Sequence, residues 1–258
     1  MAELFMRRAS DTCEFGCYSE RGIMSYFMFV ELPNKVGDFL ASLQFATDCS
    51  NPFNNLRGES PKATIFSELD LGTEGFGKPD GAIYVECPEP TMLLIEVKLN
   101  ETYAQSCKVT KDNGYNSTIK GQLELRWRFS HLTATTPRHS HEGNEYFRES
   151  PEQKGVYADR DIFYAAAKRQ DETWLGSWRR LKIADGVKDF LRYFDQCNGR
   201  VFFCAITSED KNPFDTNNDL LMPQCGALDW QSARPMFCWL PTKAITTATF
   251  SATDDTTI

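Results

Sequence analysis

The sequence predicts an α/β domain built on a central mixed β-sheet that is flanked by α-helices. Three strand-like runs between residues 63 and 99 are separated by strong turn signals, which favours an antiparallel meander. A further buried strand is predicted at 200–207, and the expected mixed sheet combines the antiparallel meander with a parallel strand. The 258 residues contain no internal repeat and no obvious linker, which predicts a single domain over 1–258.

The first half of the chain is expected to hold two helices followed by the meander. Apolar residues recur at helical spacing over 18–47, and Pro33 divides this stretch into two helices. Residues 48–61 are rich in Asn, Pro and Gly and predict a loop. The three strands that follow are predicted at 63–71, 81–87 and 92–99.

The second half alternates between helical patterns and two further strands. Residues 117–135 have the pattern of an amphipathic helix, and a polar loop follows at 136–156. The remaining elements are predicted as helices at 159–169 and 174–197 and as strands at 200–207 and 235–240. A Thr-rich tail from about residue 242 is expected to be frayed.

Composition excludes a membrane protein and favours a reducing, cytoplasmic setting. No apolar run approaches the roughly 18 residues that a membrane span needs. The first twelve residues lack the apolar stretch of a signal peptide, and the nine cysteines include no CxxC pair. Cys13, Cys17, His139 and His141 are poorly spaced for a zinc site, so we interpret the cysteines as buried or idle thiols.

The residues that point to chemistry lie in the meander. Glu96 and Lys98 are two apart on an otherwise apolar strand, so their side chains leave the same face. Ionised groups in such a strand are costly unless they are paired, hydrated or bound to a metal. Asp80 follows a proline and opens the neighbouring strand, from which it can reach the same end of the sheet.

Two converging carboxylates make an oxygen site suited to magnesium or manganese. Such a metal polarises a phosphate and activates a water molecule. The ammonium group of Lys98 is placed to orient that water or to stabilise the charge of the transition state. The three side chains together therefore predict a site for phosphodiester hydrolysis.

The pair Pro79-Asp80 followed by Glu96-Val97-Lys98 resembles the PD-(D/E)xK phosphodiesterase superfamily of restriction-endonuclease-like nucleases. The resemblance covers mainly residues 62–99, with a helix–meander–helix–strand order around them. It implies a restriction-endonuclease-like core, metal ligation by Asp80, Glu96 and the Val97 carbonyl, and a catalytic Lys98. The expected cofactor is Mg, with Mn as the other candidate.

The same resemblance implies further site residues. Family members often add a glutamate from the first core helix, for which Glu20 is the first candidate and Glu14 the second; a solvated acid explains Glu20 equally well. Glu68, on the preceding strand, is a further candidate metal ligand. RecB-type members carry a glutamine and, four residues later, a tyrosine. Gln122 matches the glutamine, but Arg126 stands where the tyrosine is expected.

Two basic segments are candidate phosphate contacts. Arg126, Arg128 and His131 lie near one side of the 117–135 helix, and residues 178–182 combine Trp178 with basic side chains. A solvated helix face explains the second segment equally well. The net charge of −8 argues mildly against tight, non-specific binding of nucleic acid, although a basic groove can coexist with an acidic remainder.

The leading hypothesis is a Mg-dependent deoxyribonuclease acting in restriction, defence or repair. RNA is an alternative substrate, and a homodimer is compatible with family members that pair subunits to cut two strands. A second hypothesis is a catalytically silent nuclease-fold module that binds nucleic acid or a protein partner. In a third, the motif is accidental and Glu96 with Lys98 forms an ion pair on an edge strand of an unrelated α/β protein.

Overall fold

The structure is a computed structural model of the chain, and part of the chain is described. The described residues are 4–7, 14–17, 20–67, 69, 78–86, 89–109, 117–135, 185–197, 199–215, 220–225 and 228–248.

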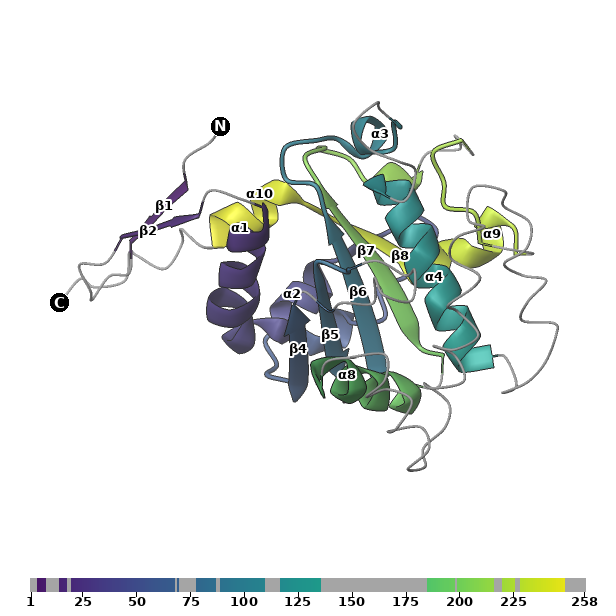
Figure 1. The fold of residues 1–258 in the computed structure, drawn as a ribbon, viewed down its shortest axis with the longest axis horizontal. Helices are drawn as coiled ribbons and strands as arrows, with labels where there is room; N and C mark the ends of the chain where they lie inside the picture. Colours follow the sequence, from purple (N-terminus) through teal and green to yellow (C-terminus); the bar gives the residue numbers. More distant parts are fainter. Residues whose placement is uncertain are drawn as a thin grey trace.

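The fold is α/β and is organised around a six-stranded mixed sheet with the strand order β3-β8-β7-β6-β5-β4 (Figure 1). The strands β4, β5 and β6 form the antiparallel meander, whereas β6, β7 and β8 run parallel, and β3 closes the sheet antiparallel to β8. The bounds are Gln44–Phe45 (β3), Ala63–Ser67 (β4), Gly81–Val85 (β5), Thr91–Val97 (β6), Val201–Thr207 (β7) and Phe237–Pro241 (β8). The predicted meander and the predicted parallel strand are therefore confirmed.

A separate two-stranded antiparallel sheet precedes this core. It pairs Leu4–Arg7 (β1) with Glu14–Cys17 (β2), and the sequence pattern did not predict it. Neither segment, LFMR nor EFGC, alternates regularly between apolar and polar residues, which is the pattern from which strands are recognised.

The predicted helical stretch is divided at Pro33, as expected, but the division is more gradual than a simple break. Glu20–Tyr26 (α1) continues into a π-helix at Phe27–Glu31 (η1) and a 3₁₀ turn at Leu32–Asn34 (η2). The ring of a proline collides with the carbonyl four residues before it, so the preceding turns widen. The second helix, α2, then occupies Val36–Ser42.

Two further helices pack on the sheet. A helix occupies the predicted 117–135 segment as Ile119–Thr135 (α4), but it is not amphipathic, because five successive side chains from Leu123 to Trp127 are buried. The end of the predicted 174–197 helix is Asp185–Gln196 (α8). The predicted polar loop at 136–156 and the predicted helix at 159–169 lie outside the described residues.

Short helical turns connect these elements. They are Asn54–Leu56 (η3), Tyr103–Ser106 (α3), Pro213–Asp215 (η7), Trp230–Ala233 (α9) and Arg234–Met236 (η8). Beyond β8 the chain forms a helix at Thr242–Ala248 (α10), and its Ile245 is fully buried. Residues 242–248 of the predicted frayed tail are helical, because the buried Ile245 anchors them to the core. In the described part of the chain, no helix has the length and apolar character needed to cross a membrane.

The central strand β6 is buried on both faces, and its side chains alternate between two apolar clusters. Met92 and Leu94 pack in the cluster that contains Trp127 of α4 and Phe190 of α8. The odd-numbered residues of β6, such as Ile95, pack in the cluster formed with η1, α2 and α10. The sheet thus separates two layers of helices, and each layer has its own core.

The contact between α2 and the η3 segment depends on a glycine. A Cβ atom at Gly37 would lie 2.3 Å from the carbonyl oxygens of both Leu56 and Glu59. Both neighbours are backbone atoms, so they cannot move aside as a flexible side chain can.

We therefore expect Gly37→Ala to lower the free energy of unfolding by about 1 to 3 kcal/mol, the usual cost of overpacking. Urea unfolding of the variant beside the parent measures this difference. Gln44→Ala, at an exposed position just beyond the same helix, is the control. Equal stability of Gly37→Ala and the parent would contradict the close approach of the two segments.

Candidate active site at the ends of β5 and β6

Asp80 lies immediately before β5 and is held against the end of β6. One carboxylate oxygen, Oδ2, accepts a hydrogen bond from the backbone N–H of Val97 at 2.8 Å. The register pairs Gly81 with Ile95, so Asp80 stands opposite Glu96 as the strands end. Beyond the last pair of β5 and β6, no backbone carbonyl of β5 accepts from the N–H of Val97, and the Asp80 carboxylate takes its place. This hydrogen bond fixes the carboxylate beside β6.

Glu96 is the penultimate residue of β6, and its side chain is 0% exposed. It shares a face with Leu94 and therefore points toward α4. There its Oε1 accepts a hydrogen bond from Nε of Arg126 at 2.6 Å, and the side chain of Arg126 is 1% exposed. Its second oxygen, Oε2, is buried and has no hydrogen-bond partner among the described residues.

Lys98 follows the last residue of β6 and is half-buried. Its backbone N–H donates to the carbonyl of Ile206 at 2.8 Å, so the parallel pairing with β7 continues through it. Because side chains alternate along a strand, Lys98 leaves the sheet on the same side as Glu96. The structure thus brings Asp80, Glu96, Val97 and Lys98 together at one end of two neighbouring strands.

Gln122 lies on α4, one turn before Arg126. Residues four apart on a helix share a face and are separated by about 6 Å along its axis. Since Arg126 reaches Glu96 of β6, Gln122 belongs to the same layer between α4 and the sheet. Its Oε1 is buried and has no hydrogen-bond partner within the described part of the chain.

The segment after Lys98 is anchored by Glu209, a residue that the sequence did not single out. The carboxylate of Glu209 accepts hydrogen bonds from the backbone N–H of Tyr103, which begins α3, and from the hydroxyl of Thr207. Trp239 of β8 donates its indole N–H to the Thr207 hydroxyl oxygen at 2.9 Å. This network fixes the loop that follows Lys98 to the ends of β7 and β8.

The electrostatics of the site are dominated by the burial of Glu96. The pKa of the Glu96 carboxyl is raised to about 8; desolvation is the largest cause and the negative charge of Asp80 adds to it, while Arg126 and Lys98 oppose the shift. The loss of hydration therefore outweighs the attraction of the two cations. A ligand that brings positive charge to Glu96 would have to displace its proton.

The oxygen donors suit a hard cation, but the full predicted ligand set is not assembled. Among the described residues, no group of three or more His, Cys, Asp and Glu side chains comes together as a metal site. Glu68, the side chain of Glu20 and that of Glu14 lie outside the described part of the chain. What fits a cation is Asp80 with the buried, unpartnered Oε2 of Glu96.

The expectation that Arg126 contacts phosphate from the surface is wrong. Its guanidinium is buried against Glu96 rather than exposed. A signal for this contact was present, because a glutamate in an apolar strand requires a balancing charge, and Arg126 is flanked by the apolar Leu125 and Trp127. The side chains of Arg128 and His131, residues 178–182 and the residues Cys13, His139 and His141 lie outside the described part.

Comparison of the chain with protein-family models, with curated proteins and with solved structures finds no match.

The raised pKa of Glu96 predicts a pH dependence of stability. Between pH 4.5, the ordinary value, and about 8, the folded protein holds a proton on Glu96 that the unfolded chain has lost. Rising pH therefore lowers the free energy of unfolding, by at most about 1.4 kcal/mol per pH unit from this group. The neutral variant Glu96→Gln removes this contribution.

We expect Glu96→Gln to gain stability relative to the parent as the pH rises from 5 to 8. Urea unfolding of both proteins at pH 5, 6.5 and 8 gives the difference in their free energies of unfolding. The contributions of the other titrating groups are the same in both proteins and cancel in this difference. A difference that stays constant over this range would show that Glu96 is ionised throughout.

Proposed function

We propose that this chain is a metal-dependent nuclease that hydrolyses phosphodiester bonds of DNA. The observation that carries the proposal is the hydrogen bond from Val97 N–H to Asp80, which sets the two halves of the motif side by side. Asp80, Glu96 and Lys98 then share one end of a strand pair, which is the arrangement that the PD-(D/E)xK resemblance implies.

The order of the elements supports the same proposal. Helices α1 and α2 precede the antiparallel meander, and α4 follows it and leads on to the parallel strand β7. This is the helix–meander–helix–strand order of a restriction-endonuclease-like core. It places the end of β6 beneath α4, where Gln122 lies.

Each residue then has a distinct task. Asp80, Oε2 of Glu96 and the Val97 carbonyl would hold a Mg²⁺ or Mn²⁺ ion, with Glu68 and Glu20 as further candidates. The ion, when bound, polarises the phosphate and lowers the pKa of a coordinated water. Lys98 stabilises negative charge that develops on the phosphate oxygens, and its half-buried position strengthens that interaction relative to water. Gln122 offers an amide to the substrate or to Lys98.

The ion pair between Glu96 and Arg126 favours a second candidate function. Arg126 occupies one oxygen of the glutamate and supplies positive charge where the metal would sit. In a catalytically silent module that binds nucleic acid or a protein, this pair would replace the metal permanently. In a nuclease, Arg126 would bind only Oε1 of Glu96, and Oε2 would remain available to the metal ion. The two candidate functions therefore differ in whether the protein binds a metal.

The nuclease proposal predicts metal-dependent cleavage that requires Lys98. We expect the parent to cut plasmid or single-stranded DNA with Mg²⁺ or Mn²⁺, and Lys98→Ala to lose about 100-fold or more in rate, because one charge-stabilising donor is removed. Cleavage assays on supercoiled plasmid, single-stranded DNA and RNA measure the rates and identify the substrate class.

Lys62→Ala is the matched control, since Lys62 is an exposed lysine that pairs with Glu86 on the meander's edge. It should cut at the parent's rate. If Lys98→Ala cut as fast as Lys62→Ala, the assignment of Lys98 would be wrong. If the parent bound DNA without cutting any of the three substrates, the silent module would be favoured.

The two candidate functions also differ in what Arg126→Gln does. Removing the guanidinium takes away a cation that opposes the raised pKa of Glu96, so the carboxyl stays protonated to higher pH until another cation arrives. For a nuclease site we expect Mn²⁺ to bind Arg126→Gln about tenfold or more tightly than the parent and to raise its Tm.

Isothermal titration with Mn²⁺ and thermal unfolding with and without the ion provide the two readouts. Arg192→Gln, on the exposed face of α8, is the control and should match the parent. The absence of Mn²⁺ binding in both the parent and Arg126→Gln would reject a metal site at Glu96.

A further inference from the structure

A cavity of about 530 Å³ lies on the face of the sheet opposite Glu96. It is open to solvent and is lined by residues of η1, η2 and α2, by the exposed Arg57 that follows η3, by Leu240 near the end of β8 and by Ala244 of α10. Its apolar lining residues Phe27, Phe39 and Leu240 belong to the cluster that packs on the odd-numbered side chains of β6. The volume falls within the range of about 300 to 1,000 Å³ that is usual for small-molecule sites.

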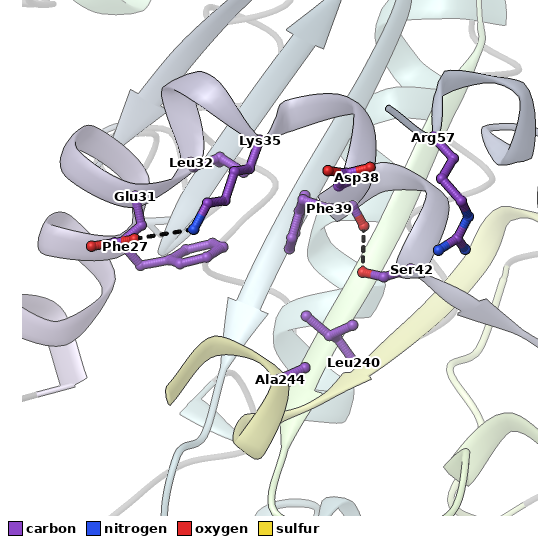
Figure 2. Close-up of a pocket in the computed structure, with 10 residues that line it drawn as sticks. All are labelled: Phe27, Glu31, Leu32, Lys35, Asp38, Phe39, Ser42, Arg57, Leu240 and Ala244. Carbon is purple, nitrogen blue, oxygen red and sulfur yellow. Dashed lines mark hydrogen bonds and ion pairs between the residues drawn. The ribbon is translucent and has the colours of Figure 1, made fainter. Parts of the chain in front are cut away.

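The lining combines an apolar wall with polar groups at two ends. Figure 2 shows the Glu31–Lys35 pair at one end of the cavity and Arg57 with Ser42 at the other, with apolar side chains between them. A mostly apolar surface with a few placed polar groups is typical of sites for small organic ligands.

The charges at the first end are matched within the protein. Nζ of Lys35 lies 3.6 Å from Oε2 of Glu31. The other oxygen of Glu31, Oε1, accepts a hydrogen bond from the hydroxyl of Tyr26 at 3.1 Å. This end therefore has little need of a charged ligand.

The second end carries a cation, Arg57, that donates to a neutral backbone carbonyl. Nη2 of Arg57 donates to the carbonyl of Ala41 at 3.2 Å, and within the described part of the chain no carboxylate forms an ion pair with Arg57. A guanidinium has five N–H donors, so a planar acceptor can still bind it through two of them. The nearby lining residue Asp38 has one oxygen engaged by the N–H of Gly58 at 2.8 Å.

One wall of the cavity is formed by a π-helix, which is an unusual backbone conformation. Phe27 and Glu31 begin and end the π-helix η1, a conformation that is rare and is found frequently at functional sites. The widened turns bring Phe27, Glu31 and the following Leu32 to the same cavity.

From these observations we infer that the cavity binds a small organic monocarboxylate with an apolar body. The body lies against Phe27, Phe39 and Leu240, and the carboxylate pairs with the guanidinium of Arg57. The negative charge of Asp38 favours a ligand with a single charge over a doubly charged phosphate ester. This binding site goes beyond the nuclease proposal, because it involves neither nucleic acid nor metal.

The test compares four eight-carbon probes on the unmodified protein by isothermal titration: octanoate, octan-1-ol, octylamine and octyl phosphate. We expect octanoate to bind, and the other three to bind about tenfold or more weakly, because they lack a singly charged acceptor for Arg57. No binding of octanoate would overturn the inference. Equal binding of octan-1-ol or octyl phosphate would overturn the charge selection.

Variants then place the probe within the protein. Arg57→Gln should weaken octanoate binding about tenfold, Arg57→Lys should retain part of it, and Arg192→Gln should match the parent. Ala244→Phe, which fills the cavity, should abolish binding while circular dichroism shows an intact fold. Unchanged binding in Ala244→Phe would place octanoate elsewhere, and unchanged binding in a folded Arg57→Gln would exclude the guanidinium.

Discussion

The buried ion pair between Glu96 and Arg126 is the interaction on which the arrangement of the site depends. It joins the end of the central strand to α4 at a point where both side chains are withdrawn from water. Removing two charges from water is costly, and the raised pKa of Glu96 shows that desolvation outweighs the attraction of Arg126. The contact is short, at 2.6 Å, so it fixes the position of α4 along β6 more narrowly than apolar packing can.

The same burial connects the fold to the chemistry of the site. Because Glu96 belongs to the core layer beneath α4, loss of hydration raises its pKa, and the carboxyl exchanges a proton near neutral pH. Asp80 is different, because its carboxylate is held at the ladder's end by a backbone N–H and is half-buried. Two carboxylates at one site thus differ in environment, which is a recurring feature of acid and base chemistry in enzymes.

Much of the sheet was predictable from local patterns, because the apolar and polar alternation of a strand and the residues that favour a turn both lie within short segments of the sequence. For this reason the ends of β4 to β8 either coincide with their predicted ends or differ from them by at most four residues. The proximity of Asp80 to Glu96 followed from pairing two adjacent strands. The partner of Glu96 did not follow, since α4 is far along the chain and periodicity does not state which polar residue a helix buries. The cavity beside Arg57 was equally hidden, because segments distant in sequence form it.

The end of β6 explains why one strand carries both a buried and an accessible charge. A strand covered by helices on both faces offers no position that water can reach, so a carboxylate within it must be balanced from a neighbouring element. Glu96 meets that condition through Arg126. Lys98 lies one residue beyond the last strand residue, where the helical cover gives way and the side chain is half-buried. Glu96 is therefore held within the core, whereas Lys98, two residues later on the same side of the strand, is partly accessible to solvent.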